Sequence, residues 1–300
     1  MFVAVSRAVL TISARNLDLM GPSVHAPRPP LSRRAREDLD VGPIDLDGVT
    51  GERYRRKDAT TGTILRFHGG GFVTGSPTLE RRPAAELALV TGCDTYGIAY
   101  RLAPGHPYPA ALDDAIAAYR ALLDRGVDPA RTFLFGGSAG AGLALACLLQ
   151  VRRLGLPRPA GAVLLWPYAD LTFSGASIDA NADVDMLPMR DLAHVWGPAY
   201  VGEADPDDPL VSPALADLDG LPPLLIIAGG AECLLSCAER IAANATAAGV
   251  QAHLSVYPDK VHGWMLLPRL PATIAATKEI TSWIAEHLEH GQAEPFEAVG

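Results

Sequence analysis

The chain has 300 residues, 49% of them hydrophobic and 20% charged, which are ordinary proportions for a globular protein with a sizeable core. Its formal net charge of -9 repels phosphate backbones, so nucleic acid is not an expected partner. No apolar run is long enough to suggest a membrane span, and the apolar start lacks the charge pattern and cleavage site of a signal peptide. The sequence therefore predicts a cytoplasmic protein.

Strand-like and helix-like segments alternate along most of the chain. Residues 1–42 show a helical pattern followed by a stretch rich in proline and arginine, with no strand signal. Several of the later strand-like runs are continuously apolar, as expected for strands covered on both faces, so the alternation predicts a mostly parallel sheet between two helical layers. The expected strands are 63–67, 94–100, 132–135, 162–166, 224–228 and 253–257, and the expected helices are 79–90, 112–125, 141–153 and 271–287.

A segment from about residue 173 to 208 interrupts this alternation. It contains several prolines and the large side chains Met186, Met189, Trp196 and Tyr200. A loop or helical insertion here would lie over the strand ends, where the lids of α/β enzymes lie.

The run Gly136-Gly-Ser-Ala-Gly140 has the G-x-S-x-G pattern of a nucleophilic serine. It follows an expected strand and precedes an expected helix, so Ser138 would lie on a sharp turn that small neighbours allow to close. The N-terminus of the helix would then stabilise negative charge near the serine. A glycine-rich turn with an incidental serine is the alternative, but it does not explain the strand–turn–helix context.

Neither glycine cluster fits a phosphate-binding loop. The sixth position of a G-x-G-x-x-G pattern is Thr74 when counted from Gly69 and Leu145 when counted from Gly140, and no Gly-Lys-Ser/Thr sequence is present. The cysteines also lack the C-x2-C spacing of a zinc site, and we interpret them as buried thiols. They are Cys93, Cys147, Cys233 and Cys237.

A second glycine run, His68-Gly-Gly-Gly-Phe72, follows the strand expected over 63–67. Ester hydrolysis places negative charge on the carbonyl oxygen, and backbone N–H groups that point toward that oxygen stabilise it. We assign this role to the N–H groups of Gly70 and Gly71, with that of Ala139 behind the nucleophile. His68 is expected to order the loop.

His262 is the candidate general base, because it lies in a loop after the last expected strand, at the edge of the sheet that carries chemistry in open α/β folds. Such a histidine needs a carboxylate to hold its tautomer. Glu232 directly follows an apolar strand, and the order Ser138, Glu232, His262 is that of α/β-hydrolase triads. Asp259 and Asp170 are the alternatives for the acid.

Taken together, these motifs resemble the hormone-sensitive-lipase-like esterases, a bacterial carboxylesterase family of the α/β-hydrolase fold. The resemblance covers about residues 44 to 290. It also includes Tyr100-Arg-Leu-Ala-Pro104, Pro109-Ala-Ala-Leu-Asp-Asp114 and Asp208-Pro-Leu-Val-Ser-Pro213.

The resemblance implies an α/β-hydrolase domain over residues 44–300, with a mostly parallel eight-stranded sheet. A small helical cap would combine residues 1–43 with an insertion around 175–205. The resemblance further implies hydrolysis of short-to-medium acyl esters without metal or cofactor, and a possible homodimer. Three residues depart from the family pattern: Gly137, where Asp or Thr is usual, Ala141, where Gly is common, and Glu232, where many members have Asp.

The substrate pocket is predicted to be apolar, although each candidate could equally be an ordinary core residue. Its candidates are Phe72, Tyr168, Met186, Trp196 and Trp264, followed by Trp166 and Met265. A lactone, amide or acetyl-xenobiotic hydrolase with the same triad is an alternative function. A non-catalytic ligand-binding protein of this fold is a second alternative, which the presence of all three triad residues argues against.

Overall fold

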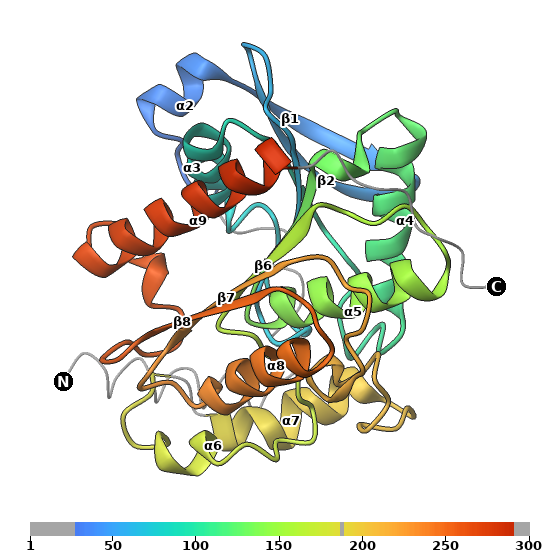
Figure 1. Ribbon diagram of the computed structural model, residues 1–300, viewed down its shortest axis with the longest axis vertical. Coiled ribbons are helices and arrows are strands. Elements are labelled where there is room, and N and C mark those ends of the chain that lie inside the picture. The colour runs from blue at the N-terminus through green and yellow to red at the C-terminus, as the bar shows by residue number, and fades with distance from the viewer. Residues whose placement is uncertain (1–27, 187–188, 291–300) are drawn as a thin grey trace.

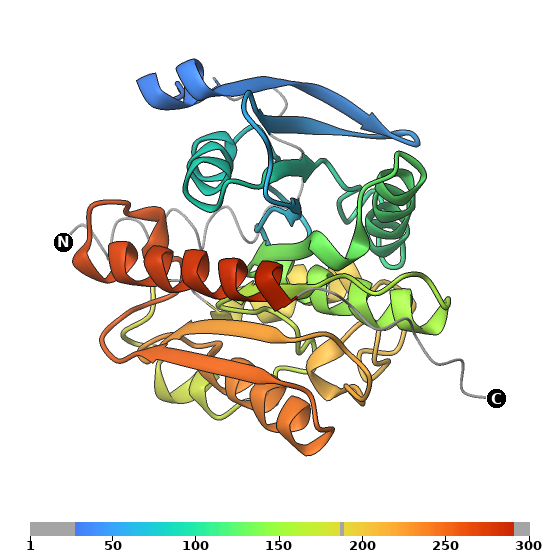
Figure 2. The same ribbon diagram turned by 45° about the horizontal axis from the view of Figure 1, so that its top comes forward.

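The computed structural model describes residues 28–186 and 189–290. Its centre is an eight-stranded sheet in the order β1-β2-β4-β3-β5-β6-β7-β8, in which only β2 runs against its neighbours (Figures 1 and 2). The predicted mostly parallel, eight-stranded α/β-hydrolase sheet is therefore confirmed. The strands are β1 Leu39–Leu46, β2 Val49–Arg56, β3 Thr63–Phe67, β4 Asp94–Ile98, β5 Thr132–Gly137, β6 Gly161–Leu165, β7 Leu224–Gly229 and β8 Ala252–Tyr257.

Helices cover both faces of the sheet. α3 and α9 pack together on one face, and α4, α5 and α8 cover the other (Figure 1). The helices are α2 Arg33–Asp38, α3 Arg81–Thr91, α4 Ala110–Asp124, α5 Ala139–Arg153, α6 Ser177–Ala180, α7 Met189–Val201, α8 Leu235–Ala247 and α9 Pro271–His290, with short 3-10 turns at Pro129–Arg131, Pro213–Leu215 and Trp264–Leu266.

The central strands are buried along their whole length because helices lie on both sides of them. β3, β6 and β7 have no exposed residue, and β5 is buried up to its last residue. This burial on both faces explains the continuously apolar sequences of β6 and β7. α5 is also buried almost throughout, since it packs against β3, β5 and β6 and is flanked by α4 and by the 3-10 turn at Pro213–Leu215.

The sequence did not predict β1, β2 or α8. β1 begins at Leu39, so the predicted domain boundary at residue 44 falls inside a strand, and the absence of a strand over 1–42 was wrong for residues 39–42. α2 packs against α3 and β1 beside the sheet, so residues 33–43 are not part of a cap. The earlier part of the predicted N-terminal cap segment, residues 1–27, lies outside the described residues.

The insertion between β6 and β7 contains α6 and α7, which lie together beyond one end of the sheet (Figure 1). These helices fall within the range predicted for a cap, 175–205, and the role of this segment as a lid stays a prediction. Within the described ranges, no helix combines the length and the apolar character needed to cross a bilayer.

Candidate active site

The four loops that carry the predicted site residues leave the same edge of the sheet. Ser138 follows β5, and the glycine run after His68 follows the neighbouring strand β3. Glu232 lies in the loop after β7, and His262 in the loop after β8. Because these strands are parallel, their carboxyl ends meet, and residues 194 positions apart in the chain come together here.

Ser138 lies on a strained turn between β5 and α5. Its φ of 55° and ψ of -123° are unusual for a residue with a side chain, and such strain is typical of functional positions. The turn is held by hydrogen bonds from the Ser138 N–H to the Leu165 carbonyl, at 2.9 Å, and from the Tyr168 N–H to the Ser138 carbonyl, at 3.1 Å. The hydroxyl is thereby presented at the N-terminus of α5.

Close backbone contacts explain the glycines on either side of this serine. A Cβ at Gly136 would overlap the carbonyl oxygen of Gly140, and a Cβ at Gly140 would overlap that of Phe67. Gly137 is different, since a Cβ there would approach only the Trp166 ring, at 3.3 Å from Nε1. The absence of a side chain at Gly137 thus leaves the indole of Trp166 close to the backbone before the serine.

The three predicted triad residues are connected in space, because His262 contacts both Ser138 and Glu232. His262 Nε2 is 3.0 Å from Ser138 Oγ, which is hydrogen-bonding distance. On the other side of the ring, His262 Nδ1 is 3.5 Å from Glu232 Oε2. The imidazole therefore lies between a hydroxyl and a carboxylate, with the edge of the Trp166 ring against it at a centroid distance of 6.1 Å.

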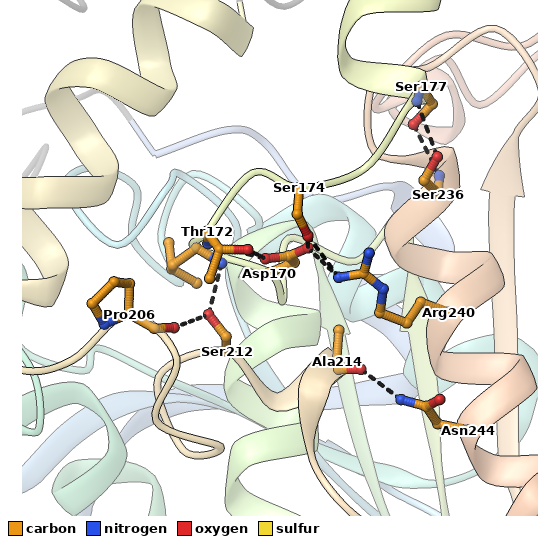
Figure 3. Close-up of polar contacts among 11 residues, drawn as sticks. Asp170, Thr172, Ser174, Ser177, Pro206, Ser212, Ala214, Ser236, Arg240 and Asn244 are labelled. Carbon is orange, nitrogen blue, oxygen red and sulfur yellow. Dashed lines mark hydrogen bonds and ion pairs between the residues drawn. The ribbon is translucent and has the colours of Figure 1, made fainter.

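The two alternative acids lie in other environments. Asp170 is buried and is bonded by Thr172, by Ser174 and by Arg240, whose Nη1 is 2.7 Å from Oδ2 (Figure 3). Asp259 is exposed at the surface after β8. Glu232 is the carboxylate whose contact with His262 the structure records.

Burial dominates the electrostatics of Glu232. The side chain is fully buried, and this desolvation raises the pKa of its carboxyl group. The contact with His262 acts in the opposite direction, whereas the nearby Asp185 carboxylate raises the pKa further. Glu232 is therefore a carboxylate whose negative charge depends on its histidine partner.

Polar side chains around the glycine loop after β3 hold its backbone in place. The His68 ring is stacked on Tyr100 at a centroid distance of 4.1 Å, and its Nδ1 is 2.8 Å from the Gly69 carbonyl. Burial lowers the pKa of His68, so its ring stays neutral. The Tyr100 hydroxyl donates to the His68 carbonyl at 2.7 Å, and the Gly69 N–H donates to Glu80, which is paired with Arg66.

The N–H groups predicted to form the oxyanion hole have no protein acceptor within the described ranges. Those of Gly70, Gly71 and Ala139 each lack such a bond, whereas the Gly70 carbonyl accepts from both Val73 and Thr74. Gly70 and Gly71 have φ values of 119° and 60°, which favour glycine. In the described part of the chain, the loop conformation thus leaves these donors without a protein acceptor.

The predicted pocket residues fall into two groups. Trp196, from α7, lies directly over Gly71, and Phe72 stacks on Tyr200 of the same helix at 3.8 Å. The Tyr168 ring is 6.1 Å from the Phe72 ring. Met186 is half-buried in the turn before α7, while Met189, the first residue of α7, has a side chain outside the described part.

Trp264 packs in the core, and its role as a pocket residue stays a prediction. It is 2% exposed and lies in the apolar layer between the sheet and α9, with its ring 4.7 Å from that of Tyr257. Trp166 belongs to the same layer but reaches the site through its contact with His262, and the half-buried Met265 packs against this layer.

Sequence reasoning missed several residues that hold the site together. Glu80 supports the glycine loop from the residue directly before α3, outside the glycine motif. Asn181 and Asp185, from the insertion, contact the loops that carry Glu232 and His262. No local pattern marks these residues: the partners of Asn181 and Asp185 are backbone groups distant in the chain, and Glu80 bonds to Gly69 and Arg66 across a loop.

Comparisons with known proteins identify the fold and the family of the chain. A family described as the alpha/beta hydrolase fold matches residues 64–266. An acetyl-hydrolase of Streptomyces hygroscopicus is 40% identical over 238 residues, covering 77% of this chain and 79% of its own. An esterase of Acinetobacter venetianus is 34% identical over 258 residues, covering 84% and 85%.

Solved structures give the same result in three dimensions. A hormone-sensitive lipase from a metagenome library superposes with a TM-score of 0.82 at 37% identity, covering 95% of this chain and 91% of its own. The esterase EstE5, in a crystal soaked with p-nitrophenyl butyrate, superposes with a TM-score of 0.83 at 32% identity, covering 96% and 97%. The chain therefore belongs to the α/β-hydrolase family, among its carboxylesterases of the hormone-sensitive-lipase type.

Proposed function

We propose that the protein hydrolyses short-to-medium acyl esters through an acyl-enzyme intermediate on Ser138. The observation that carries this proposal is the 3.0 Å contact between His262 Nε2 and the hydroxyl of Ser138, which is itself held on a strained turn. A serine hydroxyl is a weak nucleophile until a base accepts its proton, and this distance allows that transfer.

In the first half of the reaction, His262 Nε2 takes the proton from Ser138 Oγ as the oxygen attacks the ester carbonyl carbon. The carbonyl oxygen becomes an oxyanion and accepts hydrogen bonds from the N–H groups of Gly70, Gly71 and Ala139. When the intermediate collapses, the imidazolium gives its proton to the departing alcohol. Glu232 stabilises the imidazolium and keeps Nδ1 protonated throughout.

In the second half, water takes the place of the alcohol. His262 accepts a proton from this water, whose oxygen attacks the acyl carbon on Ser138. Collapse of the second oxyanion returns the proton to Ser138 Oγ and releases the carboxylic acid. These steps balance with ester and water as the reactants.

Two observations favour small acyl groups. Trp196 lies against Gly71, so a bulky ring borders the proposed oxyanion donors. The relative from Streptomyces hygroscopicus is named an acetyl-hydrolase, which supports acetyl esters as substrates of this chain. Lactones, amides and acetylated xenobiotics could be attacked by the same residues, and rates on matched ester, lactone and amide substrates distinguish these functions.

The decisive experiment compares initial rates on p-nitrophenyl acetate, butyrate, hexanoate and decanoate for the wild-type protein, Ser138→Ala and His262→Ala. We expect turnover of the short esters and a loss of up to about a million-fold in each variant. If Ser138→Ala keeps the activity, the nucleophile is wrong. Tight binding of a small molecule with no turnover would instead favour the non-catalytic alternative. The cytoplasmic location and the homodimer stay predictions.

A further inference from the structure

The turn that leads from α6 toward α7 contacts both loops that carry the proposed acid and base. Asp185 is fully buried in this turn. Its Oδ1 accepts the backbone N–H of His262 at 3.0 Å, and its Oδ2 accepts the backbone N–H of Cys233 at 2.7 Å. One carboxylate therefore joins the loop after β8 to the residue that follows Glu232.

Two further side chains of the same segment bind the loop of the acid. Asn181 Nδ2 donates to the carbonyl of Glu232 at 2.9 Å and to that of Gly230 at 3.3 Å. The Ser177 hydroxyl donates to the Cys233 carbonyl at 2.6 Å. Ser177 and Ser236 also exchange two hydrogen bonds, which attach α6 to α8 (Figure 3).

The chemistry of Asp185 suits this bridging position. An ionised carboxylate only accepts hydrogen bonds, so two amide donors on its two oxygens match its needs, and such charge-assisted bonds are stronger than neutral ones. Without these donors, the charge would be buried and unpaired, which is strongly unfavourable. The arrangement is thus stable only while both loops keep their positions.

The contact between the proposed acid and base is sensitive to loop position. His262 Nδ1 and Glu232 Oε2 are 3.5 Å apart, already at the long end of a polar contact. A small displacement of either loop would separate them, and a misplacement of about 1 Å in an active site can lower the rate about 100-fold. The group that sets the spacing of the two loops therefore affects the orientation of the imidazole.

We propose that Asp185 is a positioning residue for catalysis: its carboxylate holds the loops after β7 and β8 at the spacing at which Glu232 orients His262. The insertion between β6 and β7 is then part of the catalytic geometry as well as a neighbour of the substrate. This inference rests on the proposed function, since it concerns the triad of that reaction.

The test uses Asp185→Ala and the nearly isosteric Asp185→Asn, with Asp183→Asn as the matched control. Asp183 lies two residues away and is exposed, so its variant makes the same charge change in the same segment. Three quantities are measured on each full-length protein. They are kcat and KM for p-nitrophenyl acetate, the rate of inactivation by a p-nitrophenyl phosphonate, and the amide hydrogen exchange of Cys233 and His262 by NMR.

We expect Asp185→Ala to lower kcat about 100-fold while KM changes by less than about threefold, with phosphonate inactivation slowed in parallel. Asp185→Asn keeps one acceptor but turns an NH2 group toward the other amide, so its kcat should fall by about tenfold. Exchange at Cys233 and His262 should speed up in both variants. Asp183→Asn should match the wild type.

Several outcomes would overturn the inference. A purely structural role predicts a lower melting temperature with unchanged kcat per folded molecule. A role in substrate binding predicts a rise in KM with kcat preserved. If the wild-type protein shows no Ser138-dependent hydrolysis, the proposed function fails, and unchanged amide exchange in Asp185→Ala would separately refute the bridge between the loops.

Discussion

At the scale of single residues, Glu232 combines a catalytic task with an unfavourable location. The carboxylate must be charged to support the imidazolium, yet it is fully buried and lies near a second buried carboxylate, that of Asp185. Both effects raise its pKa in the folded protein above the ordinary value of 4.5. The native state therefore holds this group in a charge state that its surroundings disfavour.

Replacing Glu232 by Gln should therefore lower activity and raise stability. Loss of the charge should lower kcat by about ten-thousand-fold, as in other triads whose acid is neutralised. With a raised folded-state pKa, the folded protein binds more protons than the unfolded chain between the two pKa values, so wild-type stability falls as the pH rises through that window. The Glu232→Gln variant has no titrating carboxyl group at this position, so its stability does not fall in this way.

The check is a series of melting temperatures from pH 4 to pH 8 for both proteins. We expect the advantage of Glu232→Gln to be greatest at neutral pH and to shrink toward zero below about pH 4.5, where Glu232 is protonated in both states. An advantage that grows toward acid pH would contradict the sign of the pKa shift.

The glycines of the nucleophile turn give a second prediction. Gly136→Ala would force a methyl group into the Gly140 carbonyl, and neither backbone segment can move without opening the turn. We expect a loss of at least about 1–3 kcal/mol in the free energy of unfolding and little remaining activity. Gly137→Ala is the matched control, because it meets only the Trp166 ring at 3.3 Å, and it should stay folded and active.

Ser138 could be identified from sequence, because the close backbone contacts of Gly136 and Gly140 require glycine on either side of it. The same holds for the glycine loop, whose positive φ values need glycine. Asp185 and Glu80 could not be identified, since each bonds to backbone N–H groups that any residue provides. Sequence motifs thus predict the residues whose backbone geometry requires glycine, whereas supporting residues such as Asp185 and Glu80 are recognised only in the folded structure.

At the scale of elements, α7 brings large rings onto the proposed oxyanion loop. Trp196 fills the space above Gly71, and Tyr200 stacks on Phe72. The sequence predicted the insertion and these aromatics, but it could not separate Trp196 from Trp264. Both are buried indoles near the proposed catalytic motifs, and the structure places Trp196 against Gly71 and Trp264 in the apolar layer under α9.

This distinction predicts different effects of the two tryptophans on substrate preference. Trp196→Ala should enlarge the space beside Gly71 and raise kcat/KM for p-nitrophenyl hexanoate relative to acetate by about tenfold. Trp264→Phe, in the layer under α9, should lower the melting temperature and leave the hexanoate-to-acetate ratio unchanged. An equal rise of the hexanoate-to-acetate ratio in both variants would indicate a general loosening of the protein. An unchanged ratio in both variants would mean that the acyl group does not bind beside Trp196.

At the scale of the whole molecule, the sequence predicted the parallel centre of the sheet but not its first two strands. β6 and β7 are continuously apolar because both of their faces are covered, and β3 and β5 are buried in the same way. β1 and β2 form the edge, carry charged residues and alternate only weakly between buried and exposed positions. Strands with one solvated face and few apolar residues leave little periodic signal, and their place is decided by pairing with β4.

The insertion and the sheet layers are also joined by an ion pair that should contribute to global stability. Arg240 of α8 donates to Asp170, which follows β6, and to Ser174 (Figure 3). Asp170 is 5% exposed and the Arg240 side chain 30%, so removing the guanidinium leaves an almost buried carboxylate without its cation. We expect Arg240→Leu to lower the free energy of unfolding by about 2–4 kcal/mol, near the lower part of the range for buried pairs because Arg240 is partly solvated.

Urea unfolding of four proteins separates the ion pair from simple packing. The wild type is compared with Arg240→Leu, Asp170→Asn and the double variant, because the double variant removes the unpaired charge together with its partner. We expect the double variant to be more stable than Arg240→Leu alone, since the stranded carboxylate is the main source of the loss. Additive effects of the two changes would mean that Arg240 acts through packing of its stem against α8, and that the insertion is held by Ser177 and Ser236 instead.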